Sequence, residues 1–183
     1  MSTTLAERFA TVSAKSAKYY IMKIADFQIH DSEKLDLILT DLVEMILRGQ
    51  QNDPDGFGRV AAAILDNDNR VVPALNHIVA DSDERVHAER AAMNKYREMY
   101  GEIPAGSIII TTLSPCSEHN MDERYGESCS ELINESPVKK VYCGYVDPTQ
   151  LDSPEFLHKR YHLRCTKNKK LEQLCQAIAH TFL

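Results

Sequence analysis

Apolar and polar residues follow two different periods along this chain, and these periods predict helices and strands in alternation. Between Asp31 and Gly49 the apolar residues recur every three or four positions, which is typical of a helix that buries one face. Over residues 107–113 they run almost continuously instead, which is typical of a fully buried strand. In chain order, the pattern predicts helices over residues 3–27, 31–49, 81–100 and 171–182 and strands over residues 57–65, 71–79, 107–113, 138–146 and 161–165. This alternation favours an α/β fold, a three-layer α/β/α sandwich around a mixed five-stranded sheet.

Turn-forming and capping residues indicate where several of these elements begin and end. The polar run 66–69 lies between two predicted strands and suits the tight turn of a β-hairpin. The polar run 81–83 offers capping residues for the helix that follows it. Pro115 comes directly after a buried strand and fits the first turn of a helix, where its missing N–H costs nothing.

Length and composition are consistent with one folded domain. The chain has 183 residues, of which 43% are hydrophobic, and this is enough for one packed core. We expect a helical extension over residues 1–30 and a single domain over residues 31–183.

Charge, cysteine content and hydropathy exclude several classes of protein. The 27 acidic residues exceed the 21 basic ones and give a net charge of −6, so a nucleic-acid partner is not expected. The five cysteines are odd in number and irregularly spaced, which indicates reduced thiols rather than a disulfide framework. The N-terminus lacks the pattern of a signal peptide, and no apolar run approaches about 18 residues. These observations predict a soluble cytoplasmic protein with no membrane partner.

The candidate chemistry lies in His87, Glu89, Cys116 and Cys129. Two residues apart on a helix, His87 and Glu89 point in different directions and cannot both bind one metal ion from mid-helix. At the start of a helix, however, His87 can reach a metal in front of the helix while Glu89 covers the open coordination position. Three protein ligands, a fourth position for water and a nearby carboxylate that moves protons are typical of a catalytic zinc site. His-x-Glu is weak evidence by itself, but its combination with Pro-Cys after a buried strand and with a later Cys is strong.

With these residues the sequence resembles the cytidine deaminase-like superfamily of zinc-dependent nucleobase, nucleoside and nucleotide deaminases. The resemblance spans about residues 42–147 and rests on Phe57-Gly58, Asn76, His87-Ala88-Glu89, Thr112-Leu113-Ser114-Pro115-Cys116 and Gly144-Tyr145-Val146-Asp147. It implies a cytidine deaminase-like fold, a Zn²⁺ cofactor, and hydrolytic replacement of a ring amino group by a carbonyl with release of ammonia. The resemblance also implies that Glu89 carries protons in this reaction.

The resemblance also implies substrate contacts and an assembly. Asn76 is expected to hydrogen-bond the substrate, a backbone carbonyl near Ser114 to accept from the amino group, and Asp147 to lie near the mouth of the site. For Asn76 and Asp147 an ordinary turn or strand-end role is the alternative. Members of the superfamily commonly form dimers or tetramers, so the resemblance predicts a homodimer or a higher homo-oligomer.

The third metal ligand departs from the usual pattern. Pro-Cys-x-x-Cys would place it at position 119, which is His119 here, whereas the next cysteine is Cys129. Cys116 and His119 could share one helical face, and histidine is a normal zinc ligand. The spacing to Cys129 instead resembles the deaminase domain of riboflavin biosynthesis, in which an insertion displaces the second cysteine. We favour Cys129 as the ligand, which leaves His119 as a substrate contact or a surface residue.

The segment between these cysteines bears on the substrate. It contains the charged or aromatic residues Asp122, Glu123, Arg124, Tyr125 and Glu127. Such a segment either forms part of the pocket wall or is a solvated loop, and its acidity favours a small neutral base or nucleoside. Two other functions stay open: deamination of a base in RNA or DNA, as in the tRNA adenosine deaminases, and a non-catalytic zinc-stabilised binding module. The negative net charge disfavours a nucleic-acid substrate, and the presence of Glu89 disfavours a non-catalytic binding module.

Overall fold

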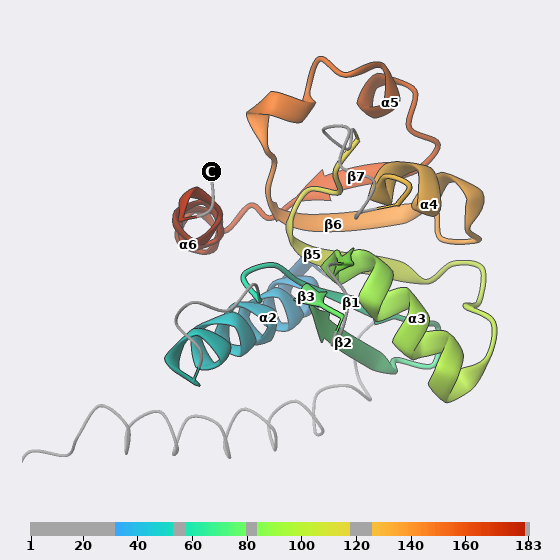
Figure 1. Ribbon diagram of the computed structural model, residues 1–183, viewed down its shortest axis with the longest axis horizontal. Helices are drawn as coiled ribbons and strands as arrows, with labels where there is room; N and C mark the ends of the chain where they lie inside the picture. The colour runs from blue at the N-terminus through green and yellow to red at the C-terminus, as the bar shows by residue number, and fades with distance from the viewer. Residues whose placement is uncertain (1–31, 53–57, 80–83, 118–125, 182–183) are drawn as a thin grey trace, which may run out of the picture.

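The computed structural model describes residues 32–52, 58–79, 84–117 and 126–181, which Figure 1 draws in colour. The predicted extension over 1–30, His119 and most of the insert before Cys129 lie outside the described residues. In chain order the elements are α2 (Ser32–Asn52), β1 (Ala61–Leu65), β2 (Val71–Leu75), β3 (His77–Ile78), β4 (Arg85–Val86), α3 (Ala88–Tyr100), β5 (Ile108–Leu113), α4 (Cys129–Glu135), β6 (Lys140–Tyr145), η3 (Pro148–Gln150), α5 (Pro154–Leu157), β7 (His162–Cys165) and α6 (Lys169–His180). Within these residues no helix is both long enough and apolar enough to span a bilayer.

Five strands form one mixed sheet in the order β2-β1-β5-β6-β7. β1 pairs antiparallel with β2 and with β5, whereas β5, β6 and β7 run parallel to one another. The turn between β1 and β2 is stabilised by the Asp66 carboxylate, which accepts from the backbone N–H groups of Asp68 and Arg70 at 2.9 Å each. Asn69 completes the turn in the left-handed region, with φ 64°. The predicted hairpin and the predicted mixed five-stranded sheet are confirmed.

Helices cover both faces of the sheet, so the predicted three-layer sandwich is confirmed (Figure 1). Ile110 of β5 belongs to the same buried cluster as Leu39 of α2, on the face that α6 also covers. Its neighbour Ile109 belongs to the opposite cluster, together with Met93 of α3 and Ile133 of α4. Successive residues of a strand point to opposite faces, which explains why this strand is apolar at nearly every position.

The helix that carries the candidate catalytic residues begins later than its sequence predicts. A helix from residue 81 is wrong, because Arg85 and Val86 form β4 and pair antiparallel with Ile78 and His77 of β3. This pairing keeps the chain extended up to His87, and α3 starts only at Ala88. The same pairing divides the predicted strand over 71–79 into β2 and β3, with Asn76 between them.

Two further boundaries differ from the predictions. α2 continues through Asn52, past the predicted end near Gly49. Pro115 does not open a helix within the described residues, because residues 114–117 are irregular and the next helix, α4, begins at Cys129. The consequence for the site is that Cys116 lies in a loop at the end of β5, while Cys129 is the first residue of a helix.

Candidate active site

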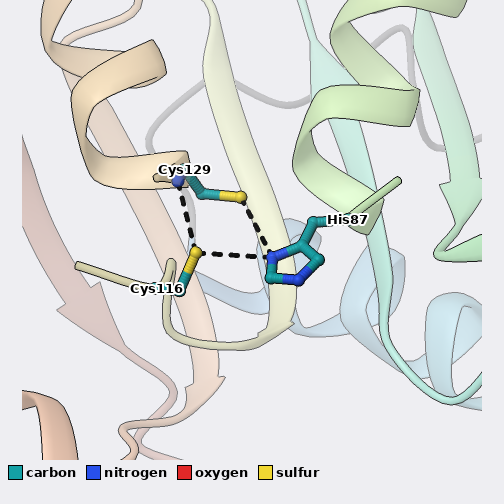
Figure 2. A group of neighbouring side chains, drawn as sticks. All are labelled: His87, Cys116 and Cys129. Atoms are coloured by element: carbon teal, nitrogen blue, oxygen red, sulfur yellow. Dashed lines mark hydrogen bonds between the residues drawn. The ribbon is translucent and has the colours of Figure 1, made fainter. Parts of the chain in front are cut away.

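The first part of the site is the start of α3. His87 is the N-cap residue, with an extended backbone (φ −68°, ψ 154°), and its side chain makes no capping hydrogen bond to the helix. Its imidazole instead lies in front of the helix, beside Cys116 and Cys129 (Figure 2). Glu89 follows in the first turn and is buried. His87 thus directs its imidazole in front of the helix toward the two cysteines, and the Glu89 carboxylate lies beside Cys129, with Oε2 3.5 Å from Cys129 Sγ.

The loop after β5 supplies Cys116, and the strand beside it holds this loop in place. The backbone N–H of Ser114 donates to the carbonyl of Tyr145 at 2.8 Å, and the Ser114 hydroxyl accepts from the backbone N–H of Asp147 at 3.1 Å. On the other side of Cys116, both the backbone N–H and the hydroxyl of Ser117 donate to Gln150 Oε1, at 2.9 Å and 2.6 Å. Cys116 is thus tied to the end of β6 and to η3 through the residues on both sides of it.

The start of α4 supplies Cys129. Ser128 caps this helix in a capping box: its hydroxyl accepts from the Glu131 N–H at 3.2 Å, and its own N–H donates to Glu131 Oε2 at 3.0 Å. The cap fixes the backbone of the next residue, whose N–H donates to Cys116 Sγ at 3.3 Å. The N–H of Ser130 donates to the carbonyl oxygen of Cys116 at 3.0 Å. Cys116 and Cys129 are therefore held together by two hydrogen bonds from the backbone at the start of α4, one to the sulfur of Cys116 and one to its carbonyl oxygen.

The three side chains have the spacing of zinc ligands. Zn–N bonds of about 2.0 Å and Zn–S bonds of about 2.3 Å in a tetrahedron place nitrogen and sulfur ligands about 3.5 Å apart. His87 Nδ1 lies 3.3 Å from Cys116 Sγ and 3.5 Å from Cys129 Sγ (Figure 2). All three donor atoms lie within 4.8 Å of one another, and among the described residues this is the one such cluster. One imidazole and two thiols at this spacing fit three corners of a zinc tetrahedron.

The three groups shift one another's pKa in different directions. A hydrogen bond from Cys129 lowers the pKa of Cys116 well below its usual range, and His87 acts in the same direction. The same bond, together with burial, raises the pKa of Cys129. Burial disfavours the protonated imidazole, but Cys116 and Glu89 more than offset this and raise the pKa of His87. Negative charge thus concentrates at the sulfur of Cys116, and thiolate is the form that binds zinc.

Glu89 lies against this cluster and has one partner that the sequence did not indicate. Its Oε2 lies 3.5 Å from Cys129 Sγ, and its Oε1 lies 2.9 Å from the hydroxyl of Thr111 on β5. Burial raises the pKa of Glu89; the charge of His87 opposes this shift, and the negative charge of Cys116 adds to it. The only sequence signal for Thr111 is that it breaks the apolar run of β5 with a hydroxyl group. One carboxylate oxygen is thus anchored to the sheet while the other lies beside the sulfur of Cys129.

The predicted substrate residues occupy the following positions. Asn76 is buried between β2 and β3, and its Oδ1 accepts from the backbone N–H of Val60 at 2.7 Å. Asp147 is buried, and its carboxylate caps η3 by accepting from the backbone N–H and the hydroxyl of Thr149. Ser114 lies two residues before Cys116, at the end of β5. His119 falls outside the described residues, so its predicted role is untested.

Comparisons with known proteins agree with this geometry. A family profile described as the cytidine and deoxycytidylate deaminase zinc-binding region matches residues 38–145. No protein with a curated description matches the sequence at a significant level. One similar solved structure is the diaminohydroxyphosphoribosylaminopyrimidine deaminase/5-amino-6-(5-phosphoribosylamino)uracil reductase of Thermotoga maritima, with a TM-score of 0.60, 22% identity, and coverage of 82% of this chain and 41% of that one. Another is Acinetobacter baumannii RibD, with a TM-score of 0.56, 20% identity, and coverage of 82% and 40%. At these identities the likeness shows the fold, and the chain spans about two fifths of the length of either structure.

Proposed function

Since the chain belongs to the cytidine and deoxycytidylate deaminase family, by the match to its zinc-binding region over residues 38–145, we propose that it is a zinc-dependent hydrolytic deaminase. The reaction converts an amino group on a nucleobase-like ring to a carbonyl, with the oxygen taken from water and the nitrogen released as ammonia. The observation that carries this proposal is that His87, Cys116 and Cys129 converge within 4.8 Å beside the buried carboxylate of Glu89.

His87 Nδ1 and the sulfur atoms of Cys116 and Cys129 are the zinc ligands in this proposal. When bound, zinc supplies Lewis acidity that lowers the pKa of a coordinated water to near 7. Three protein donors are typical of a catalytic site, whereas a structural site usually has four. Since the described residues bring only three such donors together, this cluster supports the catalytic interpretation over the binding module.

Glu89 is the proton carrier in the proposed reaction. Its Oε2, the carboxylate oxygen nearer the ligands, takes one proton from the attacking water and passes it to the ring nitrogen. It then takes the remaining proton from the hydroxyl group formed on the ring carbon and passes it to the departing amine, so that a carbonyl and ammonia result. A carboxyl group performs both steps best when its pKa lies near the operating pH, and burial shifts the pKa of Glu89 in that direction. The hydrogen bond from Thr111 keeps the other oxygen, Oε1, directed into the sheet.

The substrate that we propose is a small amino-bearing base or nucleoside. Asn76, the backbone carbonyl near Ser114, His119 and Asp147 remain the proposed substrate contacts. The net charge of −6 supports this choice over RNA or DNA, because affinity for nucleic acids is carried largely by Lys and Arg contacts to phosphate. A test of this ranking is whether RNA retains the protein in a salt-dependent manner, which we do not expect.

The variant Glu89→Gln tests the proposed function. It keeps the size of the side chain but cannot carry the proton, so we expect bound zinc at the wild-type level and a loss of turnover of about 10²-fold or more. Ammonia release is measured with cytosine, guanine, adenine and their nucleosides, and zinc content is determined on the same samples. Glu98→Gln is the matched control, because Glu98 is an exposed residue of the same helix. Full activity of Glu89→Gln, or wild-type protein that binds zinc but releases no ammonia from any amino-bearing ring, would refute the proposal.

We also propose that the chain assembles as a homodimer or a higher homo-oligomer and that residues 1–30 form an extension to the zinc domain at 31–183. One chain has a mass of 20.7 kDa. Light scattering coupled to size exclusion should therefore give a multiple of this mass, and a monomer at micromolar concentration would contradict the proposed assembly.

A further inference from the structure

A second pair of thiols lies in the sheet and is distinct from the three proposed zinc ligands. Cys143 of β6 and Cys165 of β7 are directly paired across the two parallel strands, which lie side by side in Figure 1. Their sulfur atoms are 3.4 Å apart. Neighbouring strands lie about 4.8 Å apart, within the range of about 4.4–6.8 Å that disulfides span between Cα atoms. The backbone therefore already has the spacing that a disulfide bond requires.

The two thiols differ in exposure and in acidity. Cys165 is exposed on an edge strand, whereas Cys143 is completely buried. A hydrogen bond from the Cys143 thiol lowers the pKa of Cys165 to about 7; Lys169 of α6 also lowers it, while burial and Glu172 of α6 oppose the shift. The same hydrogen bond, together with burial, raises the pKa of Cys143. The pair therefore combines a reactive thiolate that solvent can reach with a protonated thiol behind it.

We propose that Cys143 and Cys165 form a reversible oxidation site, at which a peroxide converts the two thiols to a disulfide. The Cys165 thiolate attacks one peroxide oxygen, the O–O bond breaks, and hydroxide leaves and is protonated to water. This step oxidises the sulfur to a sulfenic acid by two electrons, which reduce the peroxide. The Cys143 sulfur then attacks the Cys165 sulfur, the S–O bond breaks, and the departing hydroxide takes the Cys143 proton as water. The sulfur atoms move from 3.4 Å to about 2.05 Å apart, and a thiol reductant restores the pair.

Peptide mapping of the oxidised full-length protein tests the proposal directly. The zinc-loaded protein is treated with a small excess of hydrogen peroxide at pH 7 and digested with trypsin without reduction. Trypsin cleaves after Lys159 and Arg164, so Cys143 and Cys165 fall in different peptides. We expect these two peptides to be linked with the loss of two hydrogen atoms, and the link to disappear with dithiothreitol. Peroxide treatment that leaves both peptides unlinked, or that links other cysteines instead, would overturn the proposal.

Substitutions test the order of the two steps. Cys165→Ser should abolish the linked peptide, and Cys143→Ser should leave a sulfenic acid on Cys165 that a dimedone-type reagent traps. Cys175→Ser is the matched control, because Cys175 is a buried cysteine on α6 that should not be required for the link. The alkylation rate of Cys165 should rise with pH around a midpoint near 7 in the wild type and move toward about 8.5 in Cys143→Ala, which removes the hydrogen-bond donor that serine would keep. Equal midpoints in these two proteins would show that Cys143 does not activate Cys165 and would overturn the mechanism.

Discussion

The substitution Thr111→Val should reduce turnover without removing the metal. The Thr111 hydroxyl lies 2.9 Å from Glu89 Oε1 and 2.8 Å from the carbonyl oxygen of Leu113. When Glu89 is ionised, the hydroxyl can donate to its carboxylate. When Glu89 is protonated, the Thr111 oxygen can accept from it and donate to Leu113 instead. One side chain can therefore hold Glu89 in both of the protonation states that the proposed reaction requires.

The size of the effect follows from the charge and burial of the carboxylate. Hydrogen bonds to charged groups contribute about 1.5–3 kcal/mol, and Glu89 is only 3% exposed, so water does not readily replace the lost donor. Valine has nearly the same shape as threonine, which limits any change in packing. Because 1.36 kcal/mol corresponds to a tenfold change in rate, the expected loss of kcat is roughly 10-fold to 150-fold.

The assay is steady-state ammonia release on the best substrate, with zinc content and thermal unfolding measured on the same protein. We expect kcat to fall while KM and zinc content stay close to wild type, because Thr111 contacts Glu89 rather than the ligands. Thr111→Ser keeps the hydroxyl and should recover most of the rate. Wild-type kcat in Thr111→Val, or equal losses in the serine and valine variants, would show that the hydroxyl does not position Glu89.

Two further predictions concern the stability of the fold. Gly144→Ala places a Cβ atom against the sulfur of Cys175, 2.9 Å from the Cβ of Cys175 and 3.0 Å from the carbonyl oxygen of Thr112. It should lower the free energy of unfolding in urea by about 1–3 kcal/mol, and the double variant with Cys175→Ala should recover part of this loss. Burial opposes ionisation of Asp66, but hydrogen bonds from Tyr96 and Arg70 outweigh it and lower the pKa of Asp66. The ionised Asp66 therefore stabilises the fold above the unfolded-state pKa of about 3.9, and this contribution is lost as the pH falls below it. In Asp66→Asn, the free energy of unfolding in urea should therefore depend less on pH between about 5 and 2.

Periodicity predicted the long elements well and the short ones poorly. The buried strand over residues 107–113 corresponds to β5 within one residue, because a continuous apolar run is a local property of the sequence. Periodicity places the start of α3 too early, because β3 and β4 have two residues each, too few for any period to show. These short strands determine where the chain leaves the extended conformation and thus place His87 at the N-cap.

Residue types and spacing were enough to propose the ligands but not to complete the site. His119 and Cys129 were both chemically suitable partners for Cys116. The structure brings Cys129 to 3.5 Å from His87 through a helix that Ser128 caps, and the spacing of the candidate ligands does not indicate this cap. Thr111 was missed because a β-branched residue in a strand needs no functional explanation.

Thr111, Cys143 and Cys165 lie side by side on three neighbouring strands. Which residues of two strands pair with one another cannot be predicted from the periodicity of each strand alone. Thr111 pairs with Cys143, and Cys143 pairs with Cys165, so the three side chains follow one another across β5, β6 and β7 on one face of the sheet. One end of the row bonds the proposed proton carrier, and the other end is exposed. The two proposals nevertheless fail separately, because they depend on different atoms. Cys165→Ser should leave kcat unchanged while it abolishes the disulfide, and Thr111→Val should lower kcat while the linked peptide still forms.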